Sequence, residues 1–353
     1  MRRRGSGAKF LIAALFMAFL WGGITAGPSI AASTLTDMGY TLTDLGTLGG
    51  ASSQFVDSNA KGQVIGSSRI GGDLTNHDFL YSNGTMTDLG TLGGSYTDAI
   101  AINDSGQVIG WSQTDGDLAL HAFLYSNGTM TDLGTLGGST SYASAINGKG
   151  QVIGDAALTG GLTSHAFLYS NGTMTDLGTL GGSNSSPIAI NDSGQVIGNA
   201  NILTGYSANH AFLYSNGTMT DLGTLGGKTS YATAINGKGQ VIGWSHTDGD
   251  LARHAFLYSN GKMTDLGPLG GSYSTAFAIN DTGQVIGIFH NAEGDSHSFL
   301  YSNGKMTDLT QVVSDLFFVD TFFASKVLPS GQIVGNGYRD GHERAFILTV
   351  PNK

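Results

Sequence analysis

Imidazole and carboxylate side chains recur along this sequence at a regular spacing, which raises the question of acid–base chemistry. A histidine occurs in most repeats, and each repeat also has an aspartate in a Thr-Asp-Leu corner. A catalytic site needs one asymmetric constellation, whereas a residue found in every repeat indicates a shared structural role. We therefore expect these groups to form local hydrogen bonds that fix strand ends. They are His77, His121, His165, His210, His254 and His297, with Asp88, Asp132, Asp176, Asp221 and Asp265.

Tyrosines and acidic pairs that vary between repeats are the candidates for ligand binding. Aromatic rings near Leu-Gly-Gly corners could stack on sugars or anchor a protein, and packing between repeats is the alternative. The acidic pairs could hold Ca²⁺. None brings the further oxygen ligands of a calcium loop, so solvated turn carboxylates are favoured and no cofactor is expected. The residues are Tyr96, Tyr142, Tyr231 and Tyr273, and Asp115 with Asp117, Asp248 with Asp250, and Glu293 with Asp295.

Known catalytic signatures do not accompany these side chains. The sequence has no Gly-x-Ser-x-Gly, His-Glu-x-x-His or phosphate-loop pattern. Trp111 and Trp244 each follow Val-Ile-Gly, and we expect them to pack between repeats. Binding is therefore favoured over catalysis.

The repeat that positions these residues is about 44 residues long. Successive aspartates of the Thr-Asp-Leu corners, from Asp44 to Asp308, lie 44, 44, 44, 45, 44 and 43 residues apart. Self-similarity at such a period is typical of solenoids, propellers and arrays. Glycine, 56 of 353 residues, occupies fixed repeat positions and marks turns.

Each repeat is predicted to form four short antiparallel strands. In the second repeat, AIAIN and QVIGWS form a first hairpin around an Asp-Ser-Gly turn. A second hairpin turns at Asn-Gly, a dipeptide that tolerates positive φ at both centres of a type I′ turn. With residues 83–84 at the tip, Ser82 should face Thr85 and Phe79 should face Asp88. Apolar side chains then fall on both faces of the hairpin, as in stacked propeller blades.

The two ends of the repeat array are complementary, which predicts a closed ring. Residues Tyr40–Leu45 match a fourth strand without the three before it, and the last repeat ends at Phe346–Thr349 without a fourth strand. The N-terminal strand would complete the last blade and remove both exposed edges. The prediction is an all-β fold: a seven-bladed β-propeller of four-stranded antiparallel blades, formed by residues 33–353 as one domain.

One segment departs from the repeat pattern before the last blade. The apolar stretch Leu316–Phe323 is expected to plug one end of the ring or to dock a partner, and the plug is favoured. The inner strand of the blade is expected near Lys326–Leu328.

The variable connections are predicted to share one face of the ring. Strands two and three, and strands four and one, are joined there by stretches that differ between repeats, whereas the other turns are short and nearly invariant. Loops held by a rigid scaffold commonly carry function. We expect the ligand-binding residues on this face.

Residues 1–32 have the features of a secretory signal. A basic start is followed by an apolar core, Phe10–Trp21, and by small residues at Ser29–Ala32. An uncleaved anchor is the alternative. We expect an exported protein, extracellular or periplasmic, with no membrane span after cleavage. The chain contains no cysteine and so forms no disulfide, even in an oxidising compartment. Ring closure and packing must therefore hold the fold together.

The remaining chain is strongly acidic. The first 32 residues hold four of the 16 Lys and Arg and none of the 26 Asp and Glu, so the rest carries 12 basic against 26 acidic side chains. Such a surface argues against nucleic acid and anionic lipid as partners. We expect a monomer.

The repeat words resemble a known bacterial family, the extracellular HAF repeat. The resemblance rests on His-Ala-Phe, Asn-Gly-x-Met-x-Asp-Leu-Gly-Thr-Leu-Gly-Gly and Ala-Ile-Asn-x-x-Gly-Gln-Val-Ile-Gly, and it covers nearly all of residues 33–353. It implies an exported bacterial protein and carries no established activity or catalytic residue. The last repeat departs from it at Arg344, which replaces the histidine.

Two functional hypotheses follow. The first is a secreted, non-catalytic binding or scaffold propeller that recognises a protein or polysaccharide through its variable face. The second is an extracellular polysaccharide hydrolase or lyase that uses carboxylates such as Asp117 and Asp250 at the ring mouth. A fold alone does not imply a reaction, so binding is favoured.

Overall fold

Asn-Gly turns set the strand pairing of the second hairpins. Asn83 and Gly84 have φ values of 51° and 80°. The hairpin pairs Ser82 with Thr85 and Phe79 with Asp88, so the predicted register is confirmed. Asparagine and glycine tolerate this left-handed backbone, which strains most other residues.

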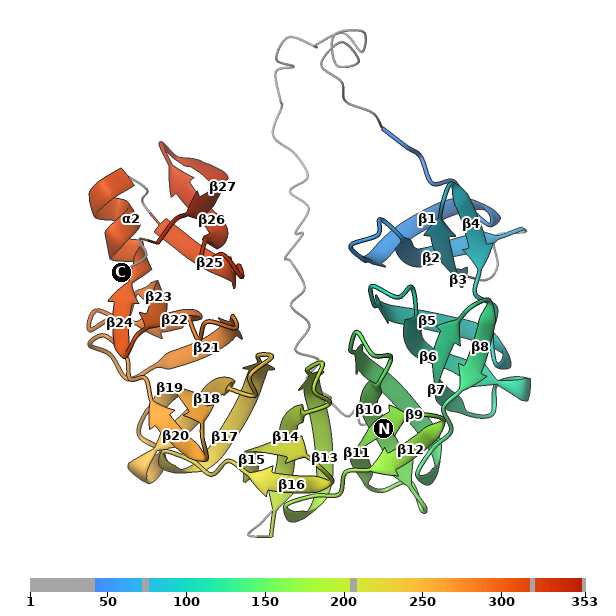
Figure 1. Cartoon of the computed structure of the whole chain (residues 1–353), viewed down its shortest axis with the longest axis horizontal. Helices are drawn as coiled ribbons and strands as arrows, with labels where there is room; N and C mark the ends of the chain where they lie inside the picture. The colour runs from blue at the N-terminus through green and yellow to red at the C-terminus, as the bar shows by residue number, and fades with distance from the viewer. Residues whose placement is uncertain (1–41, 72–75, 204–207, 318–320, 351–353) are drawn as a thin grey trace, which may run out of the picture. The chain divides into compact units, whose positions relative to one another are not determined.

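The strands form consecutive antiparallel sheets in a computed structural model that describes residues 42–71, 76–203, 208–317 and 321–350 (Figure 1). The first sheet contains β1 (Gly49–Ser58), β2 (Val64–Ile70), β3 (Asn76–Ser82) and β4 (Thr85–Asp88). The second contains β5 (Gly93–Ile102), β6 (Val108–Thr114), β7 (Leu120–Ser126) and β8 (Thr129–Asp132). The third contains β9 (Gly137–Ile146), β10 (Val152–Leu158), β11 (Ser164–Ser170) and β12 (Thr173–Asp176). A single parallel bridge links the second and third sheets.

The later sheets repeat this order. The fourth contains β13 (Gly181–Ile190), β14 (Val196–Ile202), β15 (Asn209–Ser215) and β16 (Thr218–Asp221). The fifth contains β17 (Gly226–Ile235), β18 (Val241–Thr247), β19 (Arg253–Ser259) and β20 (Lys262–Asp265). The sixth contains β21 (Ser274–Ile279), β22 (Val285–His290), β23 (Ser296–Ser302) and β24 (Lys305–Asp308). Helix α2 (Leu309–Phe317) leads to the last sheet, β25 (Thr321–Val327), β26 (Ile333–Arg339) and β27 (His342–Leu348). The predicted all-β class is confirmed.

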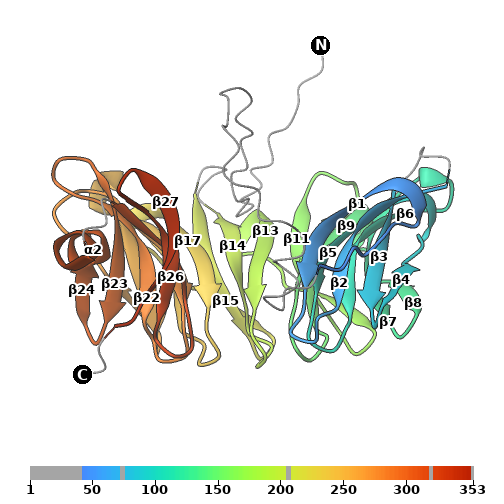
Figure 2. The same ribbon diagram turned by 90° about the horizontal axis from the view of Figure 1, so that it is seen from above.

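Neighbouring sheets lie side by side (Figure 2), and the hydrophobic core lies between them. Between the second and third sheets, Ile109 of β6 packs in one cluster with Val152 and Phe167 of the third sheet. Within the third sheet, Gly154 of β10 allows the close approach of β9, because a Cβ there would collide with the carbonyl oxygen of Tyr142. Both faces of an inner sheet are therefore buried, as the apolar pattern of the hairpins predicted.

The structure does not confirm the predicted ring closure. The last sheet has three strands, and residues 42–47 contain no strand. Within the described part of the chain, no strand pairing joins the last sheet to the first. Tyr40 and Thr41, which begin the predicted closing strand, lie outside the described residues.

The apolar segment before the last sheet contributes to the core. Of the predicted segment Leu316–Phe323, Phe322 of β25 is 1% exposed and packs with Val313 of α2 in the cluster that contains Leu300 of β23. Phe322 therefore belongs to the core, whereas Phe323 is 43% exposed. The inner strand, β25, begins at Thr321, five residues before the predicted position.

The predicted secretory signal, residues 1–32, lies outside the described residues. Among the helices that the structure does describe, none combines the length and apolar character needed to cross a membrane.

Candidate functional site

The repeated histidines and aspartates are hydrogen-bonded within each second hairpin. His165 Nδ1 lies 2.9 Å from Asp176 Oδ1, and the same Oδ1 accepts the amide of Gly178. An ionised carboxylate only accepts hydrogen bonds, so the neutral imidazole must carry its proton on Nδ1. At Asp221, burial is the largest influence and raises the pKa, but hydrogen bonds from His210 and Gly223 outweigh it and lower the pKa. The other pairs are His77–Asp88, His121–Asp132, His210–Asp221, His254–Asp265 and His297–Asp308.

Tyr96, Tyr142 and Tyr231 lie in the inner edge strands of their sheets, not in loops as predicted, and Tyr273 lies directly before β21. The first strands begin at the Gly-Gly corner, so that Tyr142 lies inside β9. Tyr142 pairs with Asp155 and Tyr231 pairs with Trp244. In the second sheet Asp98 holds that register position, and Tyr96 lies two residues earlier on the same face of β5. The four tyrosines therefore occupy two register positions.

Aromatic rings connect the second sheet to the third. Tyr96 and Trp111 have ring centroids 5.3 Å apart, and Trp111 meets Tyr142 edge-on at 5.8 Å. Tyr96 is still 40% exposed and Tyr142 38% exposed. These rings therefore pack between sheets and also keep part of their surface exposed.

Side-chain amides form a second series, which crosses the fourth sheet and reaches the fifth. Asn184 Nδ2 donates to Asn201 Oδ1 at 3.3 Å, and Asn201 Nδ2 donates to Asn209 Oδ1. Asn209 Nδ2 then donates to the hydroxyl of Tyr231 on the fifth sheet at 2.8 Å. Amides carry both donors and acceptors, so such a series can also bind hydroxyl groups.

Stacked rings and an arginine complete the connection to the sixth sheet. Tyr231 stacks on Trp244 with centroids 4.6 Å apart, and Tyr273 stacks on His290 at 4.5 Å. Arg253 Cζ lies 3.7 Å from the Trp244 centroid and 4.9 Å from that of Tyr273. We call the whole series the polar–aromatic row: Tyr96, Trp111, Tyr142, Asn184, Asn201, Asn209, Tyr231, Trp244, Arg253, Tyr273 and His290.

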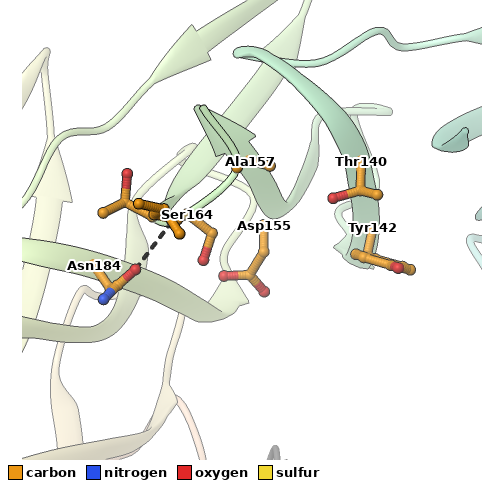
Figure 3. A pocket seen from close by; sticks show the side chains of 9 residues that line it. Thr140, Tyr142, Asp155, Ala157, Ser164 and Asn184 are labelled. Atoms are coloured by element: carbon orange, nitrogen blue, oxygen red, sulfur yellow. Dashed lines mark hydrogen bonds between the residues drawn. The ribbon is translucent and has the colours of Figure 1, made fainter. Parts of the chain in front are cut away.

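A cavity of about 270 Å³ lies beside the row in the third and fourth sheets (Figure 3). Tyr142, Asp155 and Asn184 are among its lining residues, and Asn184 Oδ1 accepts the amide of Ser164 at 3.0 Å. Burial raises the pKa of Asp155 to about 6, against a hydrogen bond from the hydroxyl of Ser186. The cavity thus combines one aromatic face, one carboxyl and several hydroxyl and amide groups.

The acidic pairs have local hydrogen-bond partners. Asp117 Oδ1 accepts the amide of Ser95 at 2.8 Å, and Asp250 Oδ1 accepts the amide of Lys228 at 2.8 Å. Two of the three pairs lie in short 3₁₀ turns, η1 (Asp115–Asp117) and η2 (Asp248–Asp250). Glu293 and Asp295 lie in the connection after β22, where their backbone amides donate to Asn291 Oδ1. The structure brings no three His, Cys, Asp or Glu side chains of its described residues together in a way that could hold a metal ion.

Several exposed leucines were not anticipated from the sequence. Each lies in the connection between the second and third strands of successive sheets and is at least 82% exposed: Leu118, Leu162, Leu203 and Leu251. Asp155, Asn184 and Arg253 were also missed. Each of these residues differs from those at the equivalent positions of neighbouring repeats. Only the structure shows that Asp155 and Asn184 line one cavity and that Arg253 contacts two rings.

Comparison with known families matches part of the chain. Residues 175–269 match a family model described as "Protein of unknown function (DUF3466)". No curated protein matches the chain.

Solved structures with similar folds include the β-propeller domain of the Trilobed protease from Pyrococcus furiosus. It is 9% identical, with a TM-score of 0.45 over 85% of this chain and 97% of that one. A puromycin-hydrolyzing peptidase from Mycobacterium tuberculosis is 12% identical, with a TM-score of 0.42 over 83% of this chain and 53% of that one. The acylaminoacyl peptidase of Pyrococcus horikoshii is 9% identical, with a TM-score of 0.41 over 83% of this chain and 52% of that one. This chain spans about half the length of the two peptidases.

Proposed function

We propose that this chain is an exported, non-catalytic binding protein of the extracellular HAF-repeat family that recognises an extended polysaccharide. The observation that carries the proposal is the polar–aromatic row. Its contacts join Tyr96 to Tyr142 in the second and third sheets and Asn184 to Tyr273 from the fourth sheet to the sixth, and both parts line the cavity between them. Aromatic faces and side-chain amides are suited to the faces and hydroxyl groups of sugars. A row across several sheets suits a polymer better than a single small molecule.

Binding without turnover is supported by the chemistry of the cavity. Hydrolysis of a glycosidic bond commonly uses two carboxyl groups on either side of the bond. Asp155 is the one carboxyl among the described residues that line the cavity. Asp117 and Asp250, the carboxylates of the alternative hydrolase or lyase, are engaged by backbone amides. Release of reducing ends from a polysaccharide panel, abolished by Asp155→Asn, would instead establish an enzyme.

We further propose that the binding scaffold is a closed seven-bladed β-propeller. The last sheet has no fourth strand beside β27, and the repeat places Tyr40–Leu45 as the segment equivalent to that strand. The register of the other hairpins would then put Thr43 opposite Ile347, as Thr87 is opposite Leu80.

A cysteine pair tests the closure. Because the chain contains no cysteine, the variant Thr43→Cys with Ile347→Cys should form one internal disulfide on mild oxidation, seen as a reducible shift on gel electrophoresis. Thr43→Cys with Leu80→Cys is the mispaired control. Equal crosslinking of both pairs, or none in the first, would contradict a closed ring.

The binding proposal predicts a loss of affinity when rings of the row are removed. Tyr142→Ala and Tyr231→Ala should each weaken binding to a polysaccharide by about tenfold, because central aromatic contacts dominate such interfaces. The measurement is calorimetric titration of the protein against soluble polysaccharides that include a neutral and an acidic polymer. Tyr338→Ala, which removes a ring 43% exposed on β26, is the matched control and should bind as the parent does. Equal affinity in all three variants would reject the row as the site.

A protein ligand is the second candidate, favoured by the exposed leucines. Isolated exposed leucines are ordinary, but here four occupy equivalent loops of four successive sheets, and one of them, Leu162, lines the cavity beside the row. If the protein binds no polysaccharide, replacing Leu118, Leu162, Leu203 and Leu251 by serine should abolish capture of a protein partner from an envelope extract.

A further inference from the structure

Arg253 breaks an otherwise exact repetition within the chain. The segments Asp115–Phe123 and Asp248–Phe256 are identical except that Leu120 of the first is Arg253 in the second. Both segments begin with the same 3₁₀ turn and continue into the third strand of their sheets. The arginine is therefore not needed for the local backbone, since leucine supports the same conformation.

The arginine is held between two rings from neighbouring sheets. Trp244 lies on the same sheet, and Tyr273 belongs to the segment that precedes β21. The backbone amide of Arg253 also donates to the carbonyl of Ser272 at 2.9 Å. A guanidinium stacked between two aromatic faces gains cation–π attraction and loses the freedom of its side chain. Its orientation is set before any ligand arrives.

Among the residues that the structure describes, no carboxylate forms an ion pair with Arg253. Its Nε is buried and has no hydrogen-bond partner within the described residues. Burial lowers the pKa of the guanidinium, and Tyr273 is the one group with an opposing influence. A guanidinium keeps its proton in proteins, so the site holds a positive charge. Leaving a half-buried charge without a partner costs stability, which a ligand anion could recover.

We propose that Arg253, with Trp244 and Tyr273, forms a subsite for an anionic group carried on a sugar ring, a uronate carboxylate or a sulfate ester. Planar guanidinium groups bind such oxyanions through paired hydrogen bonds. The rings on either side provide apolar faces for the sugar that carries the charge. This inference rests on the proposed function, because the subsite is one position in the polar–aromatic row. It adds that the polysaccharide is acidic, although the protein itself carries a net charge of −10.

Matched ligands and matched variants test the subsite. The probes are polygalacturonate against its methyl-esterified form, and dextran sulfate against dextran, each titrated at fixed ionic strength. The parent protein should bind one charged polymer about tenfold or more tightly than its neutral counterpart. Arg253→Leu imports the residue that the chain already uses at Leu120, so the variant is expected to fold. It should lose the preference for charge and keep the affinity for the neutral polymer, whereas Trp244→Ala should weaken both.

The outcomes separate the two proposals. Preference for polygalacturonate identifies a carboxylate, and preference for dextran sulfate identifies a sulfate ester. Binding of charged and neutral polymers with equal affinity by the parent, or an unchanged preference in Arg253→Leu, would overturn the anion subsite and leave polysaccharide binding intact. Absence of binding to all four polymers would reject the proposed function, and the subsite with it.

Discussion

Replacing Asp78 by asparagine is expected to stabilise the protein at pH 8, by up to about 4 kcal/mol. Asp78 on β3 is 2% exposed, and its Oδ2 accepts the amide of Ala99 on the next sheet. Burial raises the pKa of its carboxyl from 3.8 to about 7; the hydrogen bond from Ala99 opposes this shift, and Asp98 and Asp88 add to it. Asparagine keeps a hydrogen-bond acceptor and removes the buried charge.

The sign of the pH dependence follows from proton linkage. Between about pH 4 and pH 7 the unfolded chain has released the proton of Asp78 while the folded chain retains it. The free energy of unfolding therefore falls as pH rises through this window and levels off above it. Asp155, whose pKa is raised to about 6, acts in the same direction over a narrower window.

Urea unfolding at pH 4, 5.5 and 8 checks this prediction. Asp78→Asn should match the parent at pH 4 and exceed it at pH 8. Asp315→Asn removes an exposed carboxyl on α2 and should follow the parent at every pH. A variant less stable than the parent at pH 8 would mean that Asp78 is ionised and partnered in the folded protein.

Replacing Asn147 by leucine is expected to lower the free energy of unfolding by about 3 kcal/mol. Asn147 is 5% exposed. Its Nδ2 donates to Gln151 Oε1 at 2.8 Å and to the carbonyl of Asn191 on the next sheet at 3.0 Å, and its Oδ1 accepts the amide of Gln151. Leucine would remove all three bonds and leave the amide of Gln151 without its acceptor, although the carbonyl of Asn191 keeps the amide of Gly194. Equivalent asparagines join each pair of neighbouring sheets: Asn59, Asn103, Asn191, Asn236 and Asn280.

The last sheet supplies the control for this substitution. Leu328 occupies the equivalent position and has no side-chain amide; its backbone carbonyl accepts the bond from Asn280 and the amide of Gly331. Leu328→Asn should therefore change the free energy of unfolding by about 1 kcal/mol or less. Urea unfolding measures both variants, and hydrogen exchange should show reduced protection where the third and fourth sheets meet in Asn147→Leu. Similar small effects at both positions would mean that the asparagines do not couple the sheets.

Local chemistry made the strands and hairpins of this protein predictable from sequence. Positive φ at Asn83 and Gly84 selects a two-residue turn, and that turn fixes which residues face each other. The apolar pattern on both faces of the hairpin required sheets packed on both sides, which the inter-sheet clusters provide. These features depend on neighbours in sequence, and a 44-residue period repeats them.

Contacts between sheets were decided only by the tertiary structure. Arg253, Trp244 and Tyr273 come from two sheets, and nothing in their spacing indicates that the guanidinium lies between the rings. In the sequence, Asp78 only replaces the alanine of the His-Ala-Phe motif. Its burial depends on the neighbouring sheet. The predicted closing strand, which would also be a contact between distant ends of the chain, is not formed by residues 42–47.

Sequence therefore determined the repeating unit, through backbone conformation and side-chain alternation. The candidate site was determined by the placement of one sheet against the next, because that placement is the sum of many weak packing contacts.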